Sequence, residues 1–76
     1  MYFVTDNPIL FNTDTGIVIN IEPVASIEAN VWEVIMGGRA LYMGTRQECE
    51  DFVYSIAGWV GAVNPVTLEK AVNHEL

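Results

Sequence analysis

Apolar and polar residues alternate along the first half of the chain with the two-residue period that is typical of β-strands. The clearest alternation runs over residues 17–21, and the turn-forming sequence at 13–16 joins it to an earlier apolar run over 9–12. These two runs are therefore predicted to form a hairpin. Because proline cannot donate to a central ladder, Pro23 should end the second strand, and a further strand is expected over 24–29.

A second hairpin is predicted over residues 31–43, where two apolar runs meet at a Gly-Gly pair that can adopt the positive φ angles of a two-residue turn. Pairing Met36 with Arg39 across this turn sets the register of the side chains on both faces. The set expected to face the helix is Trp32, Val34, Met36, Leu41 and Met43. The set expected on the opposite face is Val31, Glu33, Ile35, Ala40 and Tyr42. Because the second set is largely apolar yet carries a carboxylate, that face is a candidate interface.

The spacing of apolar residues changes to three and four after position 44, which predicts an α-helix over residues 45–61. Thr45-Arg46-Gln47-Glu48 has the sequence of a capping box, in which the threonine and glutamate side chains each bind a free backbone amide. The apolar stripe consists of Cys49, Phe52, Val53, Ile56, Val60 and Val63, with Trp59 at its edge. Asn64-Pro65 resembles an N-cap followed by a first-turn proline, so a short terminal helix or tail is expected over 64–74.

These elements predict a single domain over residues 1–76 with an α+β fold, mainly β over 1–44. We expect a small antiparallel β-meander of about four strands packed on one amphipathic helix, with a short C-terminal helix. The segment 2–5 is either an edge strand or a loose arm. A chain of this length buries only about 60% of the surface that its unfolded form exposes. Since 51% of the residues are hydrophobic, apolar area should remain at the surface unless a partner or a second copy covers it.

The chain carries 10 acidic and 3 basic side chains, which gives a net charge of -7. Binding the phosphates of DNA or RNA requires a track of lysine and arginine side chains, so no direct nucleic-acid binding is expected. The electrostatic partner of this chain is instead a protein with a basic surface.

The first residues lack the basic and long apolar regions of a secretory signal. The longest apolar runs fall short of the roughly 18 to 20 residues that a bilayer crossing needs. A single cysteine, Cys49, cannot form an intrachain disulfide, which favours a reducing compartment. We therefore expect a cytoplasmic protein that does not bind membranes.

No segment has the pattern of a catalytic, nucleotide-binding or metal-binding site. Cys49 lies on the predicted core stripe, which indicates a buried and inert thiol. The alternative, a nucleophile, would need the only histidine, His74, to fold back from the predicted tail. Asp14 lies in a turn that lacks the repeated acidic positions and the closing glutamate of a calcium loop. We expect no enzymatic activity, no cofactor and no metal site.

Five residues are candidates for partner binding, namely Glu50, Asp51, Tyr54, Glu33 and Tyr42. Glu50 and Asp51 lie in the first helical turns, where carboxylates also interact favourably with the helix dipole without any partner. Tyr54 projects from the outer face of the predicted helix, where it either contacts a partner or lies on the surface or under the terminal helix. Glu33 and Tyr42 belong to the candidate interface of the second hairpin.

Two functional hypotheses follow from these features. In the first, the chain is a non-catalytic interaction module that presents carboxylates and aromatic area to a basic partner, inhibiting it by occupying a surface that otherwise handles nucleic acid. In size, acidity and absence of catalytic residues the chain resembles, in general character, the small phage-encoded inhibitors of host defence, anti-CRISPR proteins among them. In the alternative, an apolar sheet face makes the chain a homodimer or another homo-oligomeric structural or small-ligand-binding module.

Overall fold

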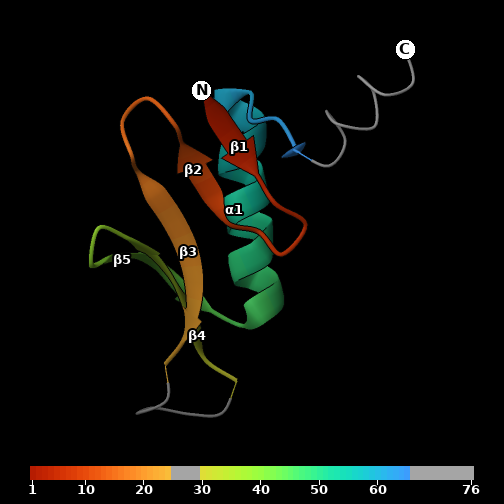
Figure 1. Cartoon of the computed structure of the whole chain (residues 1–76). Coiled ribbons are helices and arrows are strands. Elements are labelled where there is room, and N and C mark those ends of the chain that lie inside the picture. The colour runs from red at the N-terminus through yellow and green to blue at the C-terminus, as the bar shows by residue number, and fades with distance from the viewer. Residues whose placement is uncertain (25–29, 66–76) are drawn as a thin grey trace.

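The computed structural model describes residues 1–24 and 30–65. In chain order the elements are β1 (Tyr2–Val4), β2 (Leu10–Asn12), β3 (Val18–Pro23), β4 (Trp32–Met36), β5 (Arg39–Gly44) and α1 (Arg46–Val60). The strands form one antiparallel sheet in which their order along the sheet is their order along the chain (Figure 1). The predicted α+β fold is therefore confirmed, although the sheet has five strands where about four were expected. The predicted terminal helix falls almost wholly on residues 66–76, outside the described part of the chain.

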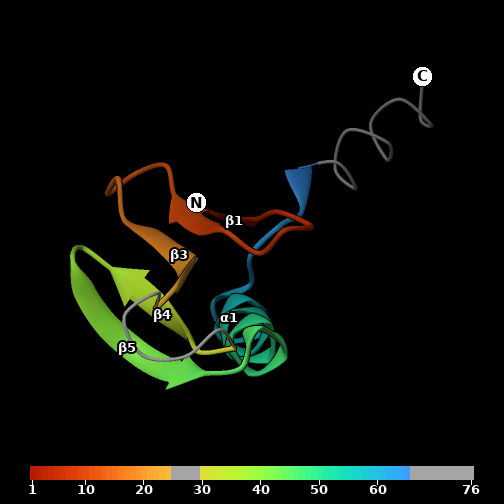
Figure 2. The ribbon, with the colours of Figure 1, turned by 90° about the horizontal axis from the view of Figure 1, so that it is seen from below.

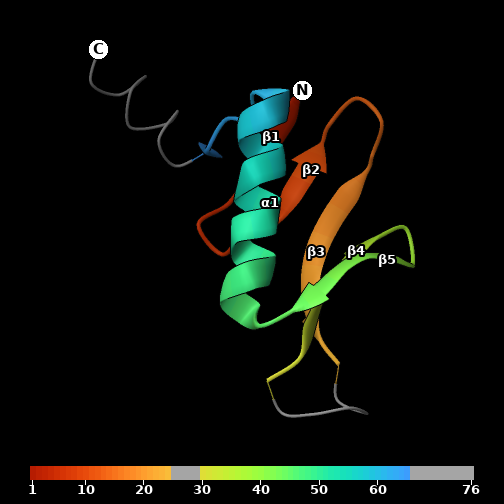
Figure 3. The same ribbon diagram turned by 180° about the vertical axis from the view of Figure 1, so that it is seen from behind.

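Helix α1 covers one face of the sheet, and no helix of the described residues covers the other (Figure 2). Figure 3 shows the covered face, with α1 lying in front of β1 and β2 and β5 running into the start of the helix. The buried core of the described residues lies between these two layers and consists of Val4, Leu10, Ile19, Val34, Cys49, Val53 and Ala57. Each strand side chain in this set alternates with a neighbour on the uncovered face, as the two-residue period requires.

The first predicted hairpin is confirmed, because β2 pairs with β3 through Leu10 opposite Ile19. Pro23 is the last residue of β3 and lies opposite Trp32 at the start of β4. Val24 follows β3 outside any strand, and its N–H donates to the Val31 carbonyl at 2.9 Å. The rest of the further strand predicted over 24–29 lies outside the described residues.

The turn of the second hairpin is confirmed, since Met36 lies opposite Arg39 and the two glycines between them have φ angles of 57° and 79°. The register predicted beyond this turn is wrong. A β-bulge between Val34 and Ile35 adds one residue to β5, so that Val34 lies opposite Tyr42 and not opposite Leu41. One added residue exchanges the faces of every later side chain on the strand.

Because of the bulge, three side chains lie elsewhere than the sequence predicted. Leu41 and Met43, which were expected in the core, are 36% and 49% exposed. Tyr42, which was expected on the opposite face, turns towards the helix instead. There its ring stacks on the Phe52 ring of α1, with 4.8 Å between the centroids. Tyr42 is thus part of the packing between the sheet and α1.

The capping box predicted for α1 is confirmed. The Thr45 hydroxyl oxygen accepts from the Glu48 backbone N–H at 3.1 Å, and Glu48 Oε1 accepts from the Thr45 N–H at 3.0 Å. The helix ends at Gly61, whose φ of 69° permits the left-handed cap. Cys49 is fully buried as predicted, and this burial raises the pKa of its thiol. Within the described residues, no helix is long and apolar enough to cross a membrane.

The chain beyond α1 returns to the sheet and lies beside β1. The Val63 N–H donates to the Tyr2 carbonyl, and the Val4 N–H donates to the Val63 carbonyl, both at 3.0 Å. Val63 therefore forms a short parallel bridge with Phe3 and does not continue the apolar stripe of the helix. This bridge identifies the segment 2–5, for which two interpretations were open, as an edge strand with its outer side partly covered.

Candidate partner-binding face

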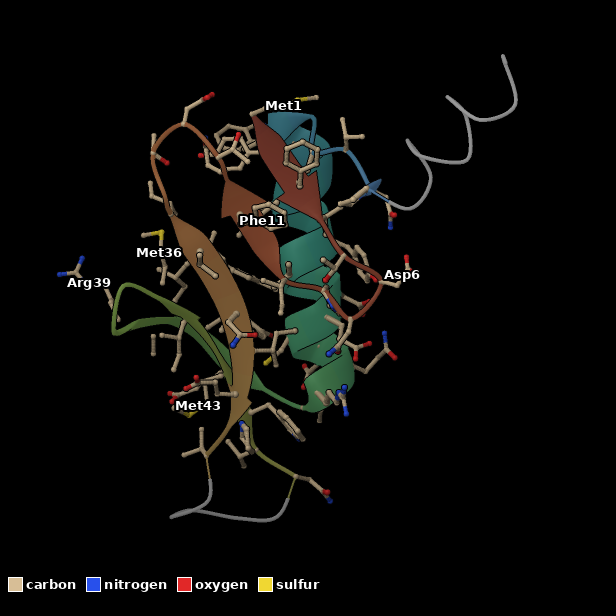
Figure 4. The ribbon with its side chains drawn as sticks, viewed as in Figure 1. Met1, Asp6, Phe11, Met36, Arg39 and Met43 are labelled. Atoms are coloured by element: carbon tan, nitrogen blue, oxygen red, sulfur yellow. The ribbon has the colours of Figure 1, made fainter. Side chains whose placement is uncertain are left out.

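The side chains that point away from α1 form a surface that we call the open face. Figure 4 looks onto its β1–β3 part, with Phe11 in front of β2 and the helix behind these strands. Strand alternation from the core residues assigns to it Phe3, Phe11, Val18, Asn20, Glu22, Glu33, Ile35, Ala40 and Met43. No described helix or strand packs on this face. It therefore combines apolar area with carboxylates on a rigid sheet.

The β1–β3 half of the open face is aromatic and aliphatic. Phe3 and Phe11 lie opposite each other on β1 and β2, and their rings stack with 5.4 Å between the centroids. Val18 lies opposite Phe11 on the next strand and is 49% exposed. A stacked aromatic pair beside an exposed valine is the kind of area that binding surfaces favour, since large rings give much contact for little loss of conformational entropy.

The β3–β5 half of the open face carries two carboxylates in one row. Glu22 lies directly opposite Glu33, and Glu33 lies opposite Met43 on β5. Like charges at directly opposed positions of antiparallel strands destabilise a sheet. Within the described residues neither carboxylate forms a salt bridge. A cation bound from outside would relieve this repulsion, so the row is suited to a basic side chain of a partner.

The acidic residues at the start of α1 are engaged in contacts within the chain. Arg46 Nε lies 3.2 Å from Glu50 Oε1, and the Arg46 guanidinium also lies over the Trp32 ring, 5.1 Å from its centroid. The Gln47 side-chain amide donates to Asp51 Oδ1 at 3.0 Å. These bonds stabilise the first turns of the helix and account for both carboxylates without a partner.

Tyr54 is 43% exposed on the outer side of α1, where the sequence placed it. Its hydroxyl donates to the Asp6 backbone carbonyl at 2.8 Å, which fastens the helix to the loop between β1 and β2. The Asn64 side chain donates to Asp6 Oδ1 at 2.7 Å in the same region. The tyrosine therefore has a structural contact that explains its position.

The structure does not bring the five predicted site residues together. Glu33 lies on the open face, Tyr42 packs between sheet and helix, and the other three lie on the outer side of α1. Sequence reasoning missed the open-face residues Phe3, Phe11, Glu22 and Met43. The alternation of Glu22 with Ile21 was a usable signal, because Ile21 packs against the core. The pairing of Phe3 with Phe11 had no such signal, since it depends on how β1 joins the sheet.

An open groove of about 470 Å³ lies between the tips of the two hairpins, lined by Thr15, Gly16, Ile17, Val18, Met36 and Gly37. Its lining has no charged side chain, so it offers a ligand little to fix its orientation. Within residues 1–24 and 30–65, no three His, Cys, Asp or Glu side chains are grouped so that they could hold a metal ion.

The Glu48 carboxylate gives the fold a dependence on pH. The backbone N–H and the hydroxyl of Thr45 hold the pKa of Glu48 below its ordinary value of 4.5. Because the folded pKa is depressed, the contribution of the carboxylate to stability is present above the unfolded pKa and is lost as pH falls through the folded pKa. We expect the stability difference between the wild type and Glu48→Gln to shrink as pH falls below 4.5 in urea titrations. A difference that stays constant with pH would contradict this role of the carboxylate.

Comparison with known proteins gives no relatives: the chain matches no family model, no curated protein and no solved structure.

Proposed function

We propose that this chain is a non-catalytic protein-interaction module whose open face binds a basic and partly apolar surface of a protein partner. The observation that carries the proposal is the Glu22–Glu33 row, two directly opposed carboxylates that form no salt bridge among the described residues and lie beside the exposed Met43 side chain. An arginine or lysine from a partner would neutralise the row. The neighbouring Ile35 and Met43 side chains would supply apolar contact area beside it.

The net charge supports a partner of opposite sign. A charge of -7 on a small domain attracts basic surfaces over a distance and raises the rate of encounter with them. Proteins that handle nucleic acids carry such surfaces, because they bind phosphates with lysine and arginine. A module that covers one of these surfaces would compete with the nucleic acid and so act as an inhibitor, most simply in the cytoplasm.

The experiment that tests this function compares two sets of charge reversals of equal size. Proteins captured from native-host lysate at low and moderately high salt are identified, and the affinity of the purified partner is then measured for each variant. Glu22→Lys with Glu33→Lys removes the open-face row and is expected to weaken binding by roughly tenfold to a hundredfold, the cost of a few charge-assisted hydrogen bonds. It should also reduce the salt dependence of the affinity.

Glu50→Lys with Asp51→Lys changes the net charge by the same amount on the outer side of α1. Under the proposal this matched variant binds with nearly the affinity of the wild type, apart from a uniform loss of long-range attraction. Loss of binding in this variant alone would show that the partner binds the outer side of α1, where Tyr54 lies, and not the open face. A partner without a basic surface, or binding that is insensitive to both pairs of changes, would overturn the proposal.

A further inference from the structure

Strand β5 forms an edge of the sheet with an open outer side. It is paired with β4 only, and no backbone hydrogen bond in the described residues reaches its other side. The opposite edge differs, because Val63 covers part of β1 with two backbone hydrogen bonds. An uncovered strand edge presents a row of free N–H and C=O groups, which can pair with another strand.

The sequence of β5 lacks most of the devices that keep strand edges from pairing. Its residues are Arg39, Ala40, Leu41, Tyr42, Met43 and Gly44, and four of the six are apolar. There is no lysine and no proline, and the only charge lies at the start of the strand. The bulge at Leu41 is the one feature that disturbs the ladder. It limits the length of regular pairing, so an assembly through β5 should be reversible and depend on concentration.

We propose that β5 pairs antiparallel with β5 of a second copy, about a two-fold axis that passes between Leu41 and Tyr42. A two-fold axis perpendicular to the sheet makes the two identical strands antiparallel and joins the two sheets into one. With the axis at this point, Ala40 lies opposite Met43 of the second copy, and both belong to the open face. Arg39 then lies opposite Gly44 of the second copy, on the helix side of the sheet.

Charge complementarity selects this register. Gly44 has no side chain, and Glu48 Oε1 lies only 3.0 Å from the position that a Cβ on Gly44 would occupy. Arg39 of one copy is therefore brought to the Glu48 carboxylate of the other, and the two-fold axis makes this contact twice. Within the described residues Arg39 forms no salt bridge in its own chain, so its guanidinium is available. Each copy thus supplies a cation to the Glu48 carboxylate of the other.

The pairing would join two open faces into one larger surface, with a Glu22–Glu33 row on each side of the axis. It does not rest on the proposed function, because the contact uses the strand edge and the helix side of β5. The prediction of a dimer can therefore fail while the prediction of partner binding holds, or the reverse.

The test is a disulfide cross-link that reads the register. In an Ala40→Cys, Met43→Cys variant, the cysteine at position 40 of one copy should lie opposite the cysteine at position 43 of the other. The Cα atoms of opposed antiparallel residues are roughly 4.5 to 5.5 Å apart. That distance suits a disulfide. Within one chain the two positions are about 10 Å apart along the strand, too far for a bond. The native Cys49 is fully buried and should not compete.

Mild oxidation of this variant should give a covalent dimer on non-reducing gels, while each single-cysteine variant should give little. In sedimentation equilibrium the average mass of the unmodified protein should rise from that of one chain to that of two as its concentration increases. The Arg39→Glu variant should need an at least tenfold higher concentration for the same increase in mass. Trp59→Lys, an exposed change near the opposite end of α1 from Glu48, serves as the control and should leave the concentration dependence of the mass unchanged. A mass of one chain at every concentration would overturn the proposal, and so would a dimer that neither cross-links in the double variant nor responds to Arg39→Glu.

Discussion

Replacing Leu10 with alanine is expected to lower the free energy of unfolding by roughly 2 to 5 kcal/mol, the range measured when a buried leucine is truncated. Leu10 is fully buried on β2 and lies opposite Val4 on one side and Ile19 on the other. All three side chains belong to the buried core. Domains are stabilised by only about 0.05 to 0.15 kcal/mol per residue, so this loss is a large part of the total for a chain of 76 residues.

Leu41→Ala is the matched control, since it removes the same atoms from a side chain that is 36% exposed on β5. We expect it to cost less than about 1 kcal/mol, because part of the side chain already contacts water and truncation leaves no closed cavity. Urea unfolding followed by far-ultraviolet circular dichroism measures both variants. Similar losses for the two leucines would show that Leu41 belongs to the core and that β5 pairs with β4 without the bulge.

Replacing both glycines of the β4–β5 turn with alanine is expected to destabilise the protein by about 2 to 4 kcal/mol. Gly37 and Gly38 have φ angles of 57° and 79°, and the left-handed region costs other residues roughly 1 to 2 kcal/mol each. A Cβ at either position would meet no atom within 4 Å. The loss should therefore come from backbone strain alone, and it is measured by the same urea unfolding.

Gly58→Ala provides the comparison, because Gly58 lies inside α1 without a positive φ and its Cβ would also meet open space. Alanine favours the helix over glycine, so this change should raise stability by about 0.5 to 1 kcal/mol. The same substitution is thus expected to have opposite signs at the turn and in the helix. A stabilising effect at the turn would mean that the hairpin closes through a different turn.

The elements that the sequence predicted well depend on neighbouring residues. The helix start was readable because Thr45 and Glu48 complete a capping box within four positions, and the hairpin turn was readable because a Gly-Gly pair is among the few dipeptides that suit it. The register beyond that turn was not readable. The bulge at Leu41 is a property of how β5 fits against β4, and it moved Tyr42 from the predicted interface into the packing against Phe52.

The residues of the candidate site divide in the same way, into those that neighbouring residues predict and those that depend on contacts between distant segments. Glu33 was identified because it interrupts an apolar strand, but its partner in the row, Glu22, comes from a strand whose pairing partner the local sequence does not specify. The stacked Phe3 and Phe11 were likewise hidden, because β1 was equally compatible with a loose arm. Charge and composition predicted a basic partner, whereas the position of the surface that would meet it depended on contacts between distant segments.

The bridge between Phe3 and Val63 has a consequence for the order in which the protein is made. Sixty residues separate the two sides of this contact, so β1 leaves the ribosome long before the segment that covers it. Until Val63 emerges, the nascent chain has two uncovered strand edges, on β1 and on β5, and afterwards the β1 edge is partly covered while β5 stays open among the described residues. The emergence of Val63 therefore covers part of the β1 edge and leaves β5 as the more open edge for strand contacts between molecules.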